Sequence, residues 1–251
     1  MAIAFVQKVN GTVVNGGSLT LPSLTASAGN ILIAGISILQ ASTTAQSAIT
    51  PTDTNGSWVD VGSPALSVDA TTVIAHGCMG AYQKNCSAGS HAVTYTFPNG
   101  VSYAEAFVAE FSGVDTASPL DLTPASSNCT VTTNGNGTPF AGPLNVGTSP
   151  TLANANELII VCGDFFAGGG FVNQGITDPP TGYTSLGAQQ DTTLSVGAEQ
   201  AYQIVSATTG VSASWTWTGS NIDDARGIIF SFQQAGAGAS ATPMLMTLGL
   251  G

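Results

Sequence analysis

Histidine, the side chain used most often in general acid–base catalysis and a common metal ligand at neutral pH, occurs only twice in this sequence, as His76 and His91. Neither stands beside a Cys, His or Asp cluster with metal-ligand spacing, so both are expected to be surface or turn residues. The sequence also lacks G-x-S-x-G, H-E-x-x-H and phosphate-loop motifs. We therefore predict that the protein is not an enzyme and has no catalytic residues, no cofactor and no metal site.

Two acidic segments could hold a cation through oxygen ligands. Residues 53–57, Asp-Thr-Asn-Gly-Ser, resemble the first half of a calcium loop, but the other ligands and the closing glutamate are missing. A turn is the better interpretation, because Asp and Asn side chains bond to their own backbone in turns. Asp223 and Asp224 could also hold a cation in a loop, although a solvated loop is the default expectation.

The four cysteines have no C-x-x-C spacing, which disfavours a zinc site. One disulfide could join Cys78 to Cys86, and another could join Cys129 to Cys162, after release from the cell. Buried free thiols are the alternative. Four cysteines allow three connectivities, and the sequence does not choose among them.

Exposed aromatic side chains could form a platform for sugar rings. The candidate glycan contacts are Trp58 and Tyr183, and the other aromatic residues that could contribute are Trp215, Trp217, Tyr95 and Phe97. Trp215 and Trp217 share one strand face by the period of two, and for them packing in a core is the stronger interpretation.

Charged side chains are scarce throughout the chain. Of 251 residues, 3 are Lys or Arg and 14 are Asp or Glu, so charged residues make up 7% of the chain, against about 25% in ordinary domains. Three dispersed basic residues cannot neutralise phosphates, which excludes nucleic acid as a partner. Hydrophobic residues reach 43%, which is enough to build a core.

No membrane partner is expected, because no apolar run reaches the roughly 18 residues of a spanning helix. The N-terminal residues lack the basic start and apolar stretch of a secretory signal, so we expect synthesis in a cytoplasm.

Short β-branched or aromatic segments bounded by turn residues predict an all-β fold of antiparallel sandwich or jelly-roll type. Helical periodicity is missing from the sequence. The expected strands are residues 31–39, 72–75, 91–97, 104–111, 158–162, 194–205, 211–218 and 227–232.

An internal repeat organises these strands into two units. Residues 28–33 match 155–160 at an offset of 127, and residues 104–111 match 225–232 at an offset of 121. We therefore predict a first β-sandwich unit at residues 1–116, a second at 117–233, and a linker with an apolar arm at 234–251. The arm is expected to dock on a neighbouring chain or fold back on its own unit, through Met244, Leu245, Met246, Leu248 and Leu250.

The repeated motifs, a G-N-[LI]-L-[IV] strand, a D-x-x-G-x-[WY] turn, an A-Y strand and a final strand ending in S-G-V-D, carry a family resemblance. They resemble a β-sandwich domain of uncharacterised tailed-phage and prophage proteins and of some bacterial surface proteins. The resemblance implies a structural virion protein, such as a capsid decoration, head fibre or tail accessory protein. It carries over no functional residue.

The resemblance also implies partners and a location. The expected partners are other virion proteins and copies of the chain itself in a homo-oligomer, on the virion surface and outside the cell after release. The alternative is a glycan-binding adhesin or lectin-like module that contacts host surface glycans.

Overall fold

A computed structural model describes residues 1–40, 49–62, 65–69, 74–126, 129–134, 140–147, 151–167, 176, 179–191, 196–219 and 222–236. This part of the chain forms fifteen β-strands and no helix, and its strand pairs are antiparallel. The predicted all-β antiparallel fold is confirmed. Among the described residues, no helix has the length and hydropathy needed to span a membrane.

The first large sheet is built mainly from the first half of the chain. Its strands run in the order β1-β8-β3-β6-β4, and β5 also pairs with β6. β3 reads ILIAGISILQ and is buried at every residue, because both faces of the sheet are covered. The strands are β1 (Ala4–Thr20), β3 (Ile31–Gln40), β4 (Val59–Asp60), β5 (Ala65–Asp69), β6 (Ile74–Gln83) and β8 (Thr94–Ser112).

The second large sheet is built from the second half of the chain. Its order is β12-β13-β11-β15-β9, so that β11 is central and flanked by β13 and β15, as β3 is flanked by β6 and β8 in the first sheet. The strands are β9 (Thr130–Asn134), β11 (Glu157–Phe166), β12 (Thr184–Asp191), β13 (Val196–Val205) and β15 (Asp224–Gln233).

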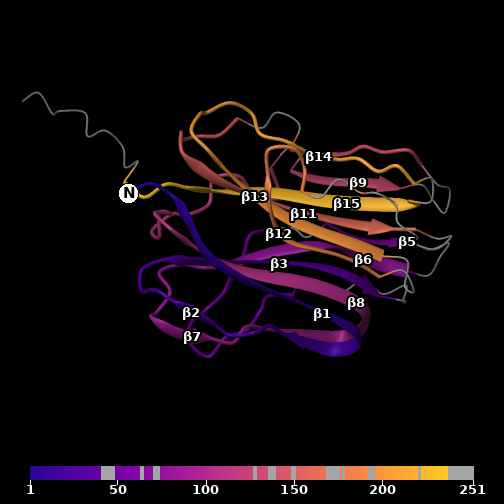
Figure 1. The fold of residues 1–251 in the computed structure, drawn as a ribbon, viewed down its shortest axis with the longest axis horizontal. Coiled ribbons are helices and arrows are strands. Elements are labelled where there is room, and N and C mark those ends of the chain that lie inside the picture. Colours follow the sequence, from indigo (N-terminus) through magenta and orange to yellow (C-terminus); the bar gives the residue numbers. More distant parts are fainter. Residues whose placement is uncertain are drawn as a thin grey trace, which may run out of the picture.

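Two small sheets cover the outer faces, so the fold has four layers (Figure 1). Leu24 packs with the outer face of the first large sheet, and Leu144 packs with the outer face of the second. The two large sheets face each other in the middle of the molecule. The small sheets pair β2 (Leu24–Ala26) with β7 (Gly89–His91), and β10 (Leu144–Val146) with β14 (Ala213–Trp215).

Glycines allow close packing between the two large sheets. Gly35 on β3 and Gly80 on β6 are register partners. A Cβ atom on Gly80 would stand 2.7 Å from the Phe230 ring, and one on Gly35 would stand 2.8 Å from Cys162 Sγ. The missing side chains thus make room for groups from the second sheet.

A second glycine pair makes room for Trp215 on the outer face of the second sheet. Gly163 and Gly227 are partners across β11 and β15, and a Cβ atom at either position would lie 3.1 to 3.4 Å from the indole. Trp215 is fully buried there and meets the ring of Phe165 edge-on. The prediction that Trp215 belongs to a core is confirmed.

Two turns before the central strands correspond at the offset of 127 residues. Gly29 and Asn156 both have positive φ, at 84° and 63°. The backbone N–H of Ser27 donates to Glu110 Oε1 at 2.8 Å, and that of Asn154 donates to Glu157 Oε1 at 3.2 Å. These correspondences favour the internal repeat, which itself stays a prediction.

The predicted boundary at residue 116 falls between β8 and β9. Val114 and Leu120 bridge to Gln234 and Phe232, so this connection lies along β15 of the second sheet. The faces of the two large sheets share one buried apolar cluster, which includes Ile33 and Phe107 as well as residues of the second sheet. The two predicted units are therefore in extensive contact.

Candidate functional site

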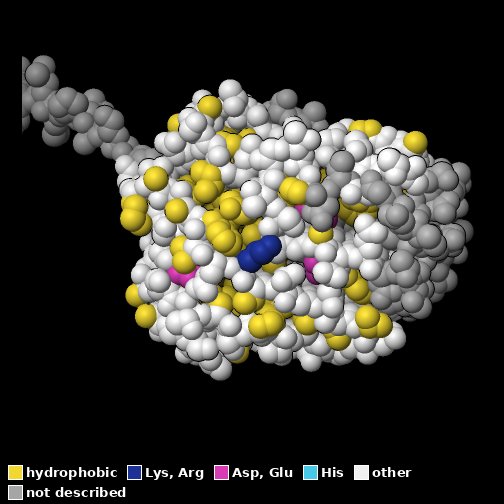
Figure 2. Space-filling model, in the orientation of Figure 1, with side chains coloured by type: hydrophobic (Ala, Val, Ile, Leu, Met, Phe, Trp, Pro, Cys, Tyr) yellow, Lys and Arg dark blue, Asp and Glu magenta, His cyan; other side chains and the backbone are white. Residues whose placement is uncertain are grey.

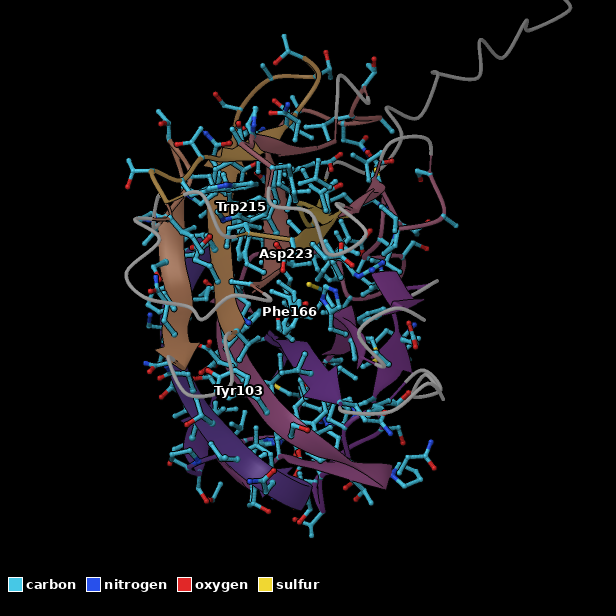
Figure 3. The ribbon with its side chains drawn as sticks, turned by 90° about the vertical axis from the view of Figure 1, so that its right-hand side faces the viewer. Tyr103, Phe166, Trp215 and Asp223 are labelled. Carbon is cyan, nitrogen blue, oxygen red and sulfur yellow. The ribbon has the colours of Figure 1, made fainter. Side chains whose placement is uncertain are left out.

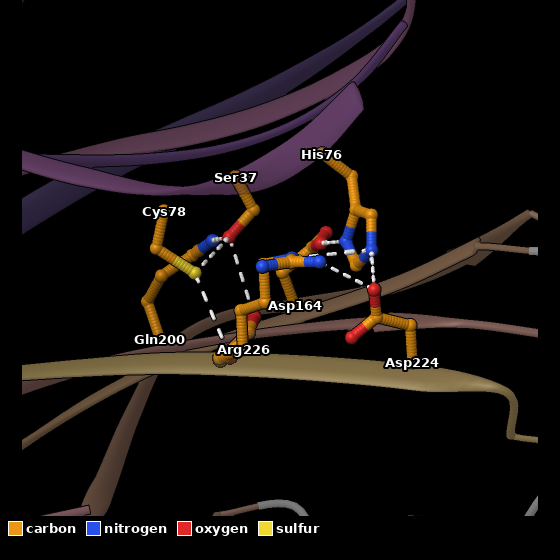
Figure 4. A network of polar contacts seen from close by, with 8 residues as sticks. Ser37, His76, Cys78, Asp164, Gln200, Asp224 and Arg226 are labelled. Carbon is orange, nitrogen blue, oxygen red and sulfur yellow. Dashed lines mark hydrogen bonds and ion pairs between the residues drawn. The ribbon is translucent and has the colours of Figure 1, made fainter. Parts of the chain in front are cut away.

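Polar side chains lie between the two large sheets, near the point where β6 and β15 begin and β11 ends (Figure 4). Five strands contribute them, and all of them are buried. We call this group the inter-sheet cluster. Its members are Ser37, His76, Cys78, Asp164, Gln200, Asp224 and Arg226.

His76 is the centre of the ionic half of the cluster. Its Nε2 atom lies 2.8 Å from Asp224 Oδ2, and its Nδ1 atom contacts Asp164 Oδ2. Burial alone lowers the pKa of His76, but the two carboxylates raise it, and the net direction is upward. A raised pKa favours the imidazolium, which can donate to both carboxylates at once.

Arg226 supplies the permanent positive charge of the cluster, with a side chain that is 0% exposed. Its Nη2 atom pairs with Asp224, and its Nε atom lies 3.2 Å from His76 Nε2. Neutral His76 can accept a hydrogen bond from Arg226, whereas protonated His76 donates to Asp224 instead. Burial raises the pKa of Asp164, and the positive charges of His76 and Arg226 offset only part of that rise.

The neutral half of the cluster joins the sheets through hydrogen bonds. The hydroxyl of Ser37 on β3 donates to the carbonyl of Gly163 on β11 at 3.3 Å, and accepts from Gln200 Nε2 on β13 at 3.2 Å. The thiol of Cys78 donates a hydrogen bond to the Arg226 carbonyl oxygen, which lies 3.9 Å from Cys78 Sγ. Each contact connects a strand of the first sheet to one of the second.

The hydrogen bonds and ion pairs of the inter-sheet cluster join the two large sheets. Ser37 bonds to amide and thiol groups, and no contact between its hydroxyl and His76 is found in the described structure, so no nucleophile–base pair is assembled. Both His76 nitrogens already face carboxylates. Among the described residues, no group of three or more His, Cys, Asp or Glu side chains could hold a metal ion.

Both histidines differ from the sequence-based expectation, because both are buried. His91 Nδ1 contacts Asp53 Oδ2, and His91 Nε2 lies 3.0 Å from the Ser87 carbonyl. The predicted turn at residue 53 is confirmed, since the backbone N–H of Asn55 donates to Asp53 Oδ1 at 3.2 Å. The carboxylate of Asp53 thus shapes the turn and orients a buried imidazole.

The default expectation of a solvated loop at Asp223 and Asp224 is wrong. Both residues are buried, and Asp224 is the first residue of β15. The cationic groups beside Asp224 are Arg226 and His76 of the chain itself. The backbone N–H of Asp223 donates to the carbonyl of Phe166, and Phe166 reaches Tyr103 of the first sheet in the same apolar cluster (Figure 3).

All four cysteines are buried free thiols, so neither proposed disulfide is formed in this structure. Cys78 and Cys162 lie in the apolar cluster between the large sheets, Cys86 donates to the Ser27 carbonyl at 3.2 Å, and Cys129 lies in the outer core of the second half. Burial raises the pKa of each thiol, that of Cys86 to about 11. Low thiolate content makes them poor nucleophiles.

The two candidate glycan contacts are core-associated. Tyr183 is buried, and its hydroxyl donates to the Ser212 carbonyl at 3.1 Å. Trp58 is half-buried against the outer core of the first half. The five apolar residues of the predicted arm, 244–250, lie outside the described residues.

A pocket of about 240 Å³ lies beside β12 and β13. Glu199 lies at this pocket and accepts a hydrogen bond from the indole N–H of Trp215. The pocket combines two amides and one carboxylate with apolar walls. Its lining residues are Phe165, Ile176, Ala188, Gln189, Gln190, Gly197, Ala198 and Glu199.

Sequence reasoning missed the inter-sheet cluster because its members are far apart in the chain. The available signal was the alignment of the two halves of the sequence, in which Arg226 occupies the position equivalent to Glu105. Both residues are buried in the structure. A charged residue within an apolar strand of a charge-poor chain indicates a buried partner, because a buried charge is costly unless it is paired.

Comparison with known proteins gives no match: no protein family, curated protein or solved structure resembles this chain significantly. The resemblance to a tailed-phage β-sandwich domain therefore stays a prediction.

Proposed function

We propose that the protein is a structural protein of a tailed bacteriophage particle, which stabilises or decorates the particle surface as a capsid decoration, head fibre or tail accessory protein. Its proposed partners are other virion proteins and copies of itself. The observation that supports a structural role is the inter-sheet cluster, because the groups most capable of chemistry are sealed from solvent and bonded across the two sheets.

The physical character of the fold is compatible with a coat that meets changing salt concentrations outside a cell. Long antiparallel ladders such as that between β1 and β8 hold the sheets through backbone hydrogen bonds. Salt screens interactions between exposed charges, whereas buried pairs such as Arg226 and Asp224 are screened much less. A charge-poor surface loses little cohesion when the ionic strength changes.

The proposal is tested by locating the chain. Particles released by cells that make the protein would be purified on a density gradient, analysed by mass spectrometry, and labelled with an antibody for electron microscopy. Stoichiometric amounts of the chain at a repeating position on the particle are expected. A chain that stays in the soluble fraction, or is washed from the particles at moderate salt, would overturn the proposal.

The pocket beside β12 and β13 favours a second candidate, a glycan-binding adhesin or lectin-like module. Side-chain amides and a carboxylate can bond to the hydroxyls of a neutral sugar, and apolar walls suit its C–H faces. Gln190 lines this pocket and is exposed, while Gln203 on β13 lies outside its lining.

A glycan array separates the second candidate from a purely structural role. Saturable binding that Gln190→Ala weakens at least tenfold, and that the matched Gln203→Ala leaves unchanged, would support the glycan-binding module. An array without saturable binding, or equal losses in both variants, would exclude this pocket as a glycan site.

A further inference from the structure

Large apolar side chains are exposed where the first residues of β1 meet the last residues of β13. Phe5 is 37% exposed, Val6 44% and Ile204 41%, and Tyr202 is half-buried between them and the core. Phe5 on β1 stacks on Tyr202 of β13, with ring centroids 5.4 Å apart and planes 12° from parallel. We call these four residues the seam patch.

The seam patch adjoins an open strand edge. β1 is the last strand of the first sheet, paired with β8 on one side and with no strand on the other in the described part of the chain. Val6 sits at a β-bulge of this strand, between Phe5 and Gln7. In the orientation of Figure 1, hydrophobic side chains gather on this face near the N-terminal end of β1 (Figure 2). An apolar strip beside unpaired backbone groups is a site for an added strand.

The C-terminal segment begins next to this patch. The backbone N–H of Ala235 donates to the Gly113 carbonyl at 2.7 Å, and Gly113 packs against Ala2, two residues before β1. Residues 237–251 follow, and fifteen residues in extended conformation span roughly 50 Å. The segment can therefore reach the seam patch of its own chain or of a neighbour in contact with it.

The final residues have the pattern that such a site requires. Met244, Met246, Leu248 and Leu250 alternate with other residues, so an extended strand would present all four on one face. The segment carries no charged side chain, and the seam patch contains none either. Packing the segment on the seam patch therefore buries no side-chain charge without a partner.

We propose that residues 244–251 bind the seam patch as an added strand along the open edge of β1, with the four alternating apolar side chains on Phe5, Val6, Tyr202 and Ile204. Burying this surface removes it from water, which is the driving force for docking. The proposal holds wherever the protein works, since it depends only on the chain itself.

Site-specific photo-crosslinking in the full-length chain tests the proposal. A photoreactive amino acid is placed at position 6 or 204 within the patch, and at position 14 as the matched control, because Val14 is 49% exposed on the same strand but outside the patch. Mass spectrometry is expected to find cross-links from positions 6 and 204 to residues 244–251, at least fivefold more abundant than from position 14.

A double variant, Met246→Asp with Leu248→Asp, is expected to abolish those cross-links while leaving the circular dichroism spectrum of the folded chain unchanged. Mixing isotopically light and heavy chains shows whether the segment binds its own chain or a neighbour, and either pairing supports the proposal. Cross-links that are equally frequent from position 14, that survive the double variant, or that lead only to other proteins would overturn it. The outcome is independent of whether the chain is found on particles.

Discussion

His76 Nε2 and Asp224 Oδ2 lie 2.8 Å apart between the two large sheets, although 148 residues separate them in the chain. This contact joins a strand of the first half to a strand of the second half. His76 also contacts Asp164, and Asp224 also pairs with Arg226, so removing one side chain of this group leaves a buried charge with fewer partners or none.

We predict that His76→Ala destabilises the protein by about 3–5 kcal/mol, because breaking a buried ion pair leaves an uncompensated charge in the core. The free energy of unfolding would be measured by urea denaturation. Lys84→Ala is the control, since Lys84 makes an exposed contact with the Ala117 carbonyl and its loss should cost less than about 0.5 kcal/mol. Similar losses in both variants would show that the cluster contributes little to the junction of the sheets.

The cluster also marks how far the sequence could be interpreted. Short β-branched and aromatic segments correctly predicted an all-β scaffold, but His76 and Asp224 were assigned to the surface or to a solvated loop. Their pairing depends on the stacking of two sheets, and strand periodicity does not report which sheet faces which. The alignment of Arg226 with Glu105 between the two halves was the hint that a buried partner existed.

Protein stability is expected to fall between pH 5 and pH 7 because of Glu157. Burial raises the pKa of Glu157 to about 7, the Ser231 hydroxyl lowers it in part, and nearby Asp121 raises it further. The folded state thus holds a proton that the unfolded state releases near pH 4.5. The stability that this proton contributes is complete below pH 4.5 and is lost as the pH rises through about 7. Over this range the free energy of unfolding falls by up to about 1.4 kcal/mol per pH unit.

Glu157→Gln should flatten the stability profile over this range, as measured by denaturation at pH 5, 6 and 7. Glu110→Gln is the comparison variant, because Glu110 contributes to the pH dependence of stability with the opposite sign. Despite burial, hydrogen bonds from Gln7, Ser27 and Asn30 lower the pKa of Glu110, so its contribution is present above pH 4.5 and is lost as the pH falls through its lowered value. A slope unchanged by Glu157→Gln would assign the proton to another group.

Gly80→Ala tests the close approach of the two large sheets. A Cβ atom at this position would stand 2.7 Å from the Phe230 ring and 3.0 Å from Val61, so overpacking is expected to cost about 1–3 kcal/mol. Gly17→Ala is the matched control, because a Cβ atom there meets no atom within 4 Å. Equal thermal stability in both variants would mean that the sheets can separate locally without cost.

The strands were predictable where one segment has a continuous apolar run, as in β3 and β11. β12 and the full length of β1 were not expected, because Gly16, Gly187 and Ala188 are residues of types that are uncommon in strands. These edge strands form because the neighbouring strand and the packed faces determine their conformation. Residues 211–218 were expected to form one long strand, yet only Ala213–Trp215 pair with β10.

The state of the cysteines gives the last test, because burial and disulfide formation predict opposite results with a thiol reagent. All four thiols are buried, and desolvation raises the pKa of each. We expect no reaction with an aromatic disulfide reagent in the folded protein at pH 8, and four reacted thiols per chain in denaturant, since only an accessible thiolate attacks. Two reacted thiols per chain in denaturant would show that one disulfide forms after all. No reacted thiol would show that two disulfides form. Cys86→Ser should lower the count to three, and the release of an unpaired Cys78 in that variant would identify the first pairing.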